Sequence, residues 1–416
     1  MNCQTENFLH LLRSFLWGNT ARLDSPDWAK LCDLAGLHNL IPAVYSAASR
    51  TEEFSRADAS ARTQLLETTL VQSSRQFMRT QELFRIYEKL LSAGIQPLIL
   101  KGLICRSLYP EPELRVSCDE DLWVRKEDLA ACDRILRACG YTPDFDDVTP
   151  ILDTVQEITY ENGVLVIELH LNLFGTANSD RFQMTQVFCR SFSQNMELEI
   201  QGHKVFTLYP TEHFLFLFLH LYKHFSVSGA GIRHIMDFLM FLDKYNEDID
   251  FTRIRLVVSQ FRGELFYCSL LEIGKTYLGF SPQKSAELFS LSISRPELEL
   301  LLEDIIQSGC FGNASKVQKL GSTYVMSYAI SSETHRPQIL PLLFPKAEFL
   351  YPSFPLLVRH RWLLPFAWCA RILKFFWKTC RSDKKEVSEG IRYGKKRVRL
   401  LKKYKTFPGT VAKVDK

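Results

Sequence analysis

The residues best suited to chemistry lie together in the stretch from Leu98 to Val124, LILKGLICRSLYPEPELRVSCDEDLWV. Asp119 and Asp121 stand at the start of an apolar run, and the alternation of side chains along a strand predicts that they share one face. Their Cα atoms are then roughly 6.6 Å apart, at about 3.3 Å of rise per residue. Two carboxylates at this spacing can converge on a hard cation such as Mg2+. With Lys101 and Arg115 nearby to meet phosphate, the set is typical of phosphoryl or nucleotidyl transfer.

A third carboxylate lies on a second predicted strand. Asn162-Gly163 separates two β-rich runs, which is a strong hairpin signal. In the second run Glu168 falls on an otherwise apolar face, where a carboxylate is costly to bury without a partner. A divalent cation held with Asp119 and Asp121 would be such a partner. The alternative is an exposed glutamate at the end of the strand.

The ordered motif resembles the signature of polymerase-beta-like nucleotidyltransferases. It consists of a Lys-Gly pair followed, after twelve residues, by Arg-x-Ser-x-Asp-x-Asp: Lys101, Gly102, Arg115, Ser117, Asp119 and Asp121. The nearest resemblance is to the bacterial uncharacterised nucleotidyltransferase family, with the abortive-infection toxin nucleotidyltransferases as relatives. It is best over residues 77–241, and it includes Glu168-Leu169-His170 and the His-rich segment near residue 220. Glu120 departs from the family pattern, in which this position is mostly apolar.

The resemblance implies a transferase that moves a nucleoside monophosphate from an NTP such as ATP to a hydroxyl or phosphate of an unidentified acceptor, with release of pyrophosphate. It implies Mg2+ or Mn2+ bound by Asp119, Asp121 and Glu168, with Glu168 either the third ligand or the general base. Lys101, Gly102, Arg115 and Ser117 are the implied nucleotide-binding residues, Ser117 bracing either its loop or a phosphate oxygen. The alternative function is a non-catalytic nucleotide-binding scaffold or sensor with the same fold.

Gly102 has two further interpretations. If residues 103–108 are helical, the free N–H groups of Leu103 and Ile104 would face the end of the preceding strand and attract phosphate. Otherwise Gly102 only turns the chain.

The helices and strands expected around these residues indicate an α+β fold. We expect an N-terminal helical region at residues 1–75, a small mixed-sheet nucleotidyltransferase core at 76–208 and a helical domain at 209–336. Residues 337–416 are expected to form a proline-punctuated wrap followed by a basic, aromatic tail. Pro42 is expected to end the helix that begins at Trp28.

The predicted helix from Glu212 to Phe225 is nearly all Phe and Leu, so it is expected to be buried on most sides. Thr211 is its expected N-cap. The three histidines of this helix, at positions 213, 220 and 224, recur at spacings of seven and four. They favour a polar stripe facing the active-site cleft over a metal site, because no third ligand follows at suitable spacing. Arg233 and Asp237 are expected to pair on the next helix.

Charge is unevenly distributed along the chain. Residues 371–416 contain 16 Lys/Arg and 4 Asp/Glu, a net +12, whereas the whole chain has +4, so the preceding part carries −8. The basic tail indicates an anionic surface, membrane or RNA, as a partner, or else a solvated end. The segment from Arg361 to Lys378 joins aromatic and basic residues. It is expected either to rest on an anionic membrane or to dock on the protein with its charges outward.

Composition places the chain among globular proteins, with 46% hydrophobic and 24% charged residues. Its 11 cysteines include no C-x-x-C pair, which favours free thiols in a reducing compartment over disulfides or a zinc site. Neither a signal peptide nor an apolar run long enough to span a membrane is expected. We therefore expect a cytoplasmic location, with peripheral contact at the inner membrane face as a further option.

Overall fold

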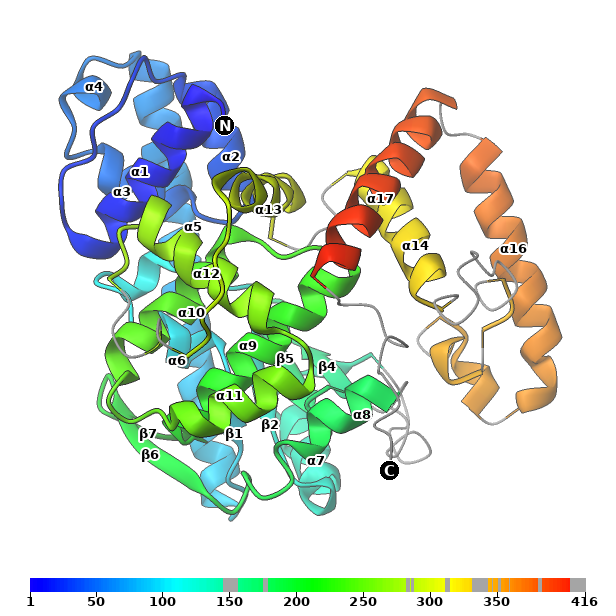
Figure 1. Cartoon of the computed structure of the whole chain (residues 1–416). Helices are drawn as coiled ribbons and strands as arrows, with labels where there is room; N and C mark the ends of the chain where they lie inside the picture. Colours follow the sequence, from blue (N-terminus) through cyan, green and yellow to red (C-terminus); the bar gives the residue numbers. More distant parts are fainter. Residues whose placement is uncertain are drawn as a thin grey trace.

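The computed structural model describes residues 1–144, 156–174, 179–281, 285, 288–310, 315–330, 343–345, 347–350, 353–358, 360–380 and 384–404. Helices dominate these residues and surround a small sheet (Figure 1). The N-terminal part contains α1 (Cys3–Trp17), α2 (Trp28–Leu37), α3 (Ile41–Ala48), α4 (Glu52–Ser55) and the long α5 (Ala59–Ser92). The predicted α+β class is confirmed.

The sheet that carries the candidate site has five strands in the order β1-β2-β5-β4-β3. These are β1 (Leu98–Ile99), β2 (Asp119–Trp123), β3 (Thr142–Pro143), β4 (Glu157–Glu161) and β5 (Val166–His170). Strands β2 and β5 run parallel, while the other neighbours are antiparallel. Between these strands lie α6 (Gly102–Arg106), η1 (Pro112–Leu114), η2 (Lys126–Asp128) and α7 (Leu129–Ala138).

The predicted hairpin is present, and a second hairpin follows it in the chain. Strands β4 and β5 flank Asn162-Gly163, and Gly163 has φ +82°, a left-handed conformation that favours glycine. After α8 (Ser179–Gln186), strands β6 (Asn195–Ile200) and β7 (His203–Leu208) form a separate two-stranded sheet that turns at Gln201-Gly202.

The C-terminal half is helical. It contains α9 (Pro210–Val227), α10 (Ile232–Tyr245), α11 (Phe251–Gln260), α12 (Glu264–Tyr277), α13 (Arg295–Ser308), α14 (Lys316–Ile330), α16 (Leu364–Cys380) and α17 (Lys384–Lys403), with short turns η5 (Ala347–Leu350), η6 (Pro355–Val358) and η7 (Arg361–Leu363). Helix α9 is buried on most sides, as its sequence predicts. Figure 1 shows α14, α16 and α17 together at one side of the molecule.

Two local expectations are wrong. Pro42 lies in the first turn of α3, and α2 has already ended at Leu37; the missing proline N–H costs nothing at a helix start. Thr211 is not the cap of α9, because that helix begins at Pro210 with Tyr209 as its N-cap residue. The Thr211 hydroxyl instead accepts a hydrogen bond from the Asp250 N–H at 2.9 Å.

Helix α17, which forms much of the basic C-terminal region, is packed into the protein. Arg397 is 1% exposed, lies 3.1 Å from the Asp304 carboxylate on α13, and donates to the Phe225 carbonyl at the end of α9 at 2.6 Å. Tyr404 is also buried, and its hydroxyl lies 3.1 Å from that of Ser269 on α12. Helix α17 and the residue that follows it therefore contact three earlier helices, α9, α12 and α13.

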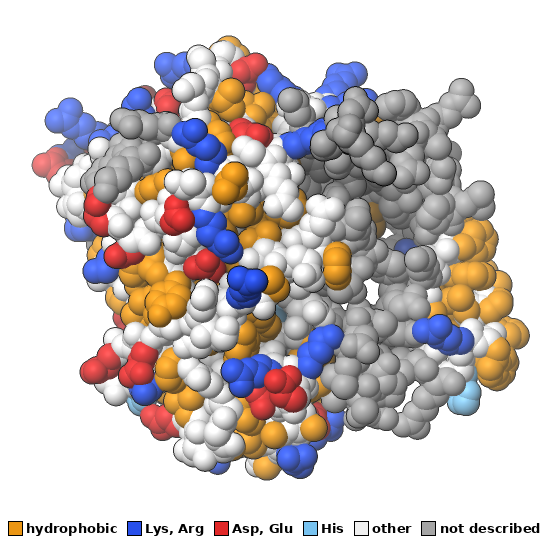
Figure 2. Space-filling model, turned by 60° about the horizontal axis from the view of Figure 1, so that its bottom comes forward, with side chains coloured by type: hydrophobic (Ala, Val, Ile, Leu, Met, Phe, Trp, Pro, Cys, Tyr) orange, Lys and Arg blue, Asp and Glu red, His pale blue; other side chains and the backbone are white. Residues whose placement is uncertain are grey.

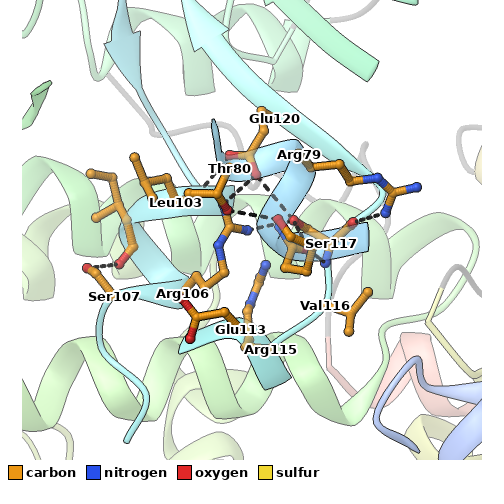
Figure 3. Close-up of polar contacts among 12 residues, drawn as sticks. Arg79, Thr80, Leu103, Arg106, Ser107, Glu113, Arg115, Val116, Ser117 and Glu120 are labelled. Carbon is orange, nitrogen blue, oxygen red and sulfur yellow. Dashed lines mark hydrogen bonds and ion pairs between the residues drawn. The ribbon is translucent and has the colours of Figure 1, made fainter. Parts of the chain in front are cut away.

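A buried ion pair attaches the acidic strand β2 to α6. Glu120 and Arg106 are 1% and 2% exposed, and their side chains are 2.7 Å apart. Glu120 also accepts the Leu103 N–H at 2.8 Å (Figure 3). This contact requires glycine at position 102, since a Cβ there would lie 1.9 Å from a Glu120 oxygen. Glu120 thus meets a cation on the face of the strand opposite to Asp119 and Asp121.

Arg106→Met should destabilise the protein by about 3–5 kcal/mol, because it leaves the Glu120 charge buried without its partner. Chemical denaturation measures this loss. Arg137→Met is the matched control, because Arg137 is 39% exposed and its pair with Asp133 should contribute under about 1 kcal/mol. Equal losses of unfolding free energy in the two variants would show that the buried pair contributes no more to stability than the exposed pair.

Two buried histidines predict acid sensitivity. Burial lowers the pKa of His38 to about 4 and that of His213 to about 3, from an ordinary value of 6.5. At these two positions the unfolded chain therefore binds more protons than the folded one below pH 6.5, so their contribution to stability falls as the pH drops from 6.5 toward 4. Unfolding free energies of matched variants, measured across that range, isolate this decline. His38→Gln should flatten it, whereas His10→Gln, which changes an exposed ring, should leave it; identical slopes in the two variants would contradict the assignment to His38.

Candidate active site

The parallel pairing of β2 with β5 places the predicted acids side by side. Asp121 is the register partner of Glu168, and Trp123 is that of His170. One carboxylate oxygen each from Asp121 and Glu168 and one ring nitrogen of His170 lie within 4.8 Å of one another. Asp119 shares this strand face but lies outside that cluster. The structure therefore brings Asp121 and Glu168 together, as the sequence predicts, and adds His170.

His170 connects the acids of three strands. Its Nε2 lies 3.0 Å from Asp121 Oδ1 on β2 and 3.7 Å from Glu168 Oε2, and its Nδ1 lies 3.3 Å from Glu157 Oε2 on β4. Burial by itself would lower the pKa of His170, but the hydrogen bond to Asp121 and the charge of Glu157 outweigh it and raise that pKa. The ring therefore fixes the orientation of the Asp121 carboxylate.

Lys101 approaches the cluster from the end of β1. Its Nζ lies 3.4 Å from Asp121 Oδ2 and 3.1 Å from His220 Nε2 on α9. Burial opposes the charge of Lys101, but Asp121, Asp119 and Glu168 raise its pKa, so it is a cation. Burial and the Lys101 charge hold the pKa of His220 well below its usual range, so the neutral ring accepts a hydrogen bond from the ammonium group.

The site holds more negative than positive charge, and this excess affects the pKa of Glu168. Burial, followed by the charges of Asp121, Glu157 and Asp119, raises the pKa of Glu168 to about 7. A divalent cation would offset this repulsion. Carboxylate oxygens suit Mg2+ and Mn2+, and His170, whose Nε2 donates to Asp121, orients one of these carboxylates. The residues present fit a divalent cation.

Arg115 is buried away from the cluster. It is 4% exposed and forms a two-pronged pair with Asp237 on α10, at 3.0 Å from Nε and 2.5 Å from Nη2. Tyr109 donates to the same carboxylate at 2.8 Å. Arg233, the expected partner of Asp237, donates to the Val116 carbonyl instead. Arg115 thus braces the loop before β2 against α10.

Ser117 is part of the network around Glu120 (Figure 3). Its hydroxyl accepts from Arg106 Nη1 at 2.8 Å, and its N–H donates to the Gln76 side chain on α5 at 2.7 Å. The structure thus matches the first of the two expectations for Ser117, that it braces its loop. The N–H groups of Leu103 and Ile104 are not free as expected, because they donate to Glu120 and to the Lys101 carbonyl.

The expected histidine stripe is present, but it contains His234 in place of His213. His220 and His224 have ring centroids 4.4 Å apart, and His234 of α10 stacks on His224 at 5.8 Å. His213 instead packs against Phe241 and contacts Thr207. No spacing along one helix could have revealed His234, since it comes from the neighbouring helix.

An α+β core with paired strand carboxylates beside a lysine fits the nucleotidyltransferase resemblance of the sequence. The uncharacterised nucleotidyltransferase family matches the chain over residues 24–279, and the chain belongs to that family. It is accordingly a transferase. Searches of curated proteins and of solved structures found no match.

Asp121→Asn should weaken binding of Mn2+ to the full-length protein at least about tenfold, because it removes a buried ligand charge. Electron paramagnetic resonance titration measures free Mn2+ directly. Asp133→Asn, which alters a helix-surface carboxylate on α7, should bind Mn2+ like the unmodified protein. If the two variants bind alike, the cluster is not the cation site.

Proposed function

We propose that the protein transfers a nucleoside monophosphate from an NTP to a hydroxyl or phosphate of an unidentified acceptor, with Mg2+ or Mn2+ bound and pyrophosphate released. The observation that carries the proposal is the convergence of Asp121, Glu168 and His170 within 4.8 Å, beside the ammonium group of Lys101. Membership of the nucleotidyltransferase family supports the same chemistry.

Asp121 and Glu168 would hold the cation, with Asp119 on the same strand face as a further ligand. His170 donates to Asp121 and positions it, a common arrangement around metal ligands. When bound, such a cation neutralises triphosphate charge and polarises phosphoryl oxygens.

Lys101 belongs to the predicted nucleotide-binding residues, and its charged group lies beside Asp121. Its ammonium group is held by Asp121 and His220, with its side chain 17% exposed, so it can donate to a phosphate oxygen without reorganising. Gly102, Arg115 and Ser117 act on the nucleotide indirectly, by fixing α6 and the loop that leads into β2.

Glu168 is the proposed general base or third metal ligand. Burial and the neighbouring acids raise its pKa to about 7, and a carboxylate with a raised pKa accepts a proton more readily. Its side chain is 27% exposed, so an acceptor hydroxyl can approach it.

We place this activity in a bacterial cytoplasm. Ten cysteines are free thiols in the structure, in keeping with a reducing compartment. Among the described residues, no helix is long and apolar enough to cross a membrane.

Asp119→Asn and Asp121→Asn should each reduce transfer about a hundredfold or more, since a lost metal ligand costs several kcal/mol of transition-state stabilisation. The assay incubates full-length protein with labelled NTP, Mg2+ and total cell extract, and follows pyrophosphate. Asp133→Asn is the control and should keep full turnover. Near-normal turnover in both site variants would favour the scaffold alternative.

Glu168→Gln separates the two roles of that residue. If Glu168 ligates the cation, this variant should weaken Mg2+-dependent ATP binding as much as Asp121→Asn does. If Glu168 is the base, ATP binding should survive and only transfer should fall. Calorimetry with and without Mg2+ gives the binding, and the pyrophosphate assay gives the transfer; a variant normal in both measurements would remove Glu168 from the mechanism.

A further inference from the structure

A row of large apolar side chains is exposed along η7 and α16. Trp362, Phe366, Leu373 and Trp377 are 69%, 67%, 66% and 68% exposed. Their spacings of four, seven and four place them along one side of the helix. We call these four residues the aromatic stripe. Side chains of this size rarely stay so exposed in a row unless the surface binds something.

The other side of α16 is attached to the protein. Trp368 donates from Nε1 to the Pro345 carbonyl at 2.8 Å and packs edge-on against Phe344 at 5.4 Å. Ala367 is 5% exposed. The expected docking of the helix is therefore made by Trp368, while the aromatic stripe points away from the body. Figure 2 shows hydrophobic side chains gathered at the side of the molecule where α16 lies in Figure 1.

Positive charge accompanies the stripe. Lys374 and Arg371 are exposed on α16, and Arg392, Lys395 and Arg399 are exposed on α17. The last 46 residues carry a net +12, in contrast to the acidic remainder of the chain. A partner that covers the stripe must therefore accept apolar side chains and present negative charge.

We propose that the aromatic stripe docks the protein peripherally on a lipid bilayer that carries anionic headgroups. Tryptophan and phenylalanine on one side of a helix, flanked by basic residues, are typical of helices that lie in the membrane interface. The stripe runs along an outward helix side, which suits a broad bilayer surface. RNA fits less well, because Leu373 offers no ring for base stacking. Helix α16 has 17 residues, and no helix in the described part of the chain can span a membrane, so the contact is superficial.

Vesicle flotation with the full-length protein tests the proposal. The protein should float with vesicles of phosphatidylcholine and phosphatidylglycerol at low salt, and much less with phosphatidylcholine alone. Added salt should weaken the association because it screens the basic residues. Tryptophan emission should shift to shorter wavelength on the anionic vesicles, as Trp362 and Trp377 leave water. Protein that stays unbound on both vesicle types would overturn the proposal.

Matched variants locate the contact. Phe366→Ser/Leu373→Ser should reduce flotation at least tenfold, whereas Phe77→Ser/Leu256→Ser should not, although Phe77 and Leu256 are 52% and 68% exposed. Equal losses in the two double variants would overturn the assignment to the stripe. So would a dimer in light scattering that only Phe366→Ser/Leu373→Ser dissociates, since the stripe would then bind a second copy. Retained RNA binding with no vesicle binding would equally reject the bilayer. None of these measurements depends on the proposed transferase activity.

Discussion

Strand β2 carries three acids in a row, and the way their charges are met determines the rest of the site. Glu120 points to one side and is neutralised by Arg106 in a buried pair. Asp119 and Asp121 point to the other side, where Lys101 and His170 offset only part of the charge. The protein thus uses one side of the strand for attachment and leaves the other short of positive charge. A buried unpaired carboxylate is costly, so this imbalance favours binding of a cation.

The supports of this strand come from distant parts of the sequence. Ser117 is held by Gln76 of α5, and Arg115 by Asp237 of α10. Lys101 is held in turn by His220 of α9. The N-terminal helices and the helical domain therefore act as a frame that fixes the loop before β2. This explains why residues with no direct contact to the cluster belong to the same motif as the acids.

Much of the core could be predicted from sequence, for physical reasons. The alternation of Asp119 and Asp121 and the Asn162-Gly163 turn are local signals. The two acidic strands, and the faces on which their acids lie, could therefore be predicted from the sequence. The contacts of Arg115 were not, because a guanidinium that meets phosphate and one that meets Asp237 look alike in a sequence. Likewise, the spacing of His213 from His220 and His224 is correct for a stripe, but Thr207 and Phe241 hold His213 elsewhere. Side-chain partners set by tertiary packing were the part that the sequence could not supply.

The attachment of α17 has a consequence for biosynthesis. Residues 24–279 match the family, and they include every residue of the proposed site. Yet the carbonyl at the end of α9 is bonded to Arg397, and Ser269 of α12 contacts Tyr404. A nascent chain that has only just completed the family region still lacks both partners. Domains usually fold in order as they leave the ribosome. In this protein α9, the helix that carries His220, therefore gains its contact with Arg397 only after α17 has been translated.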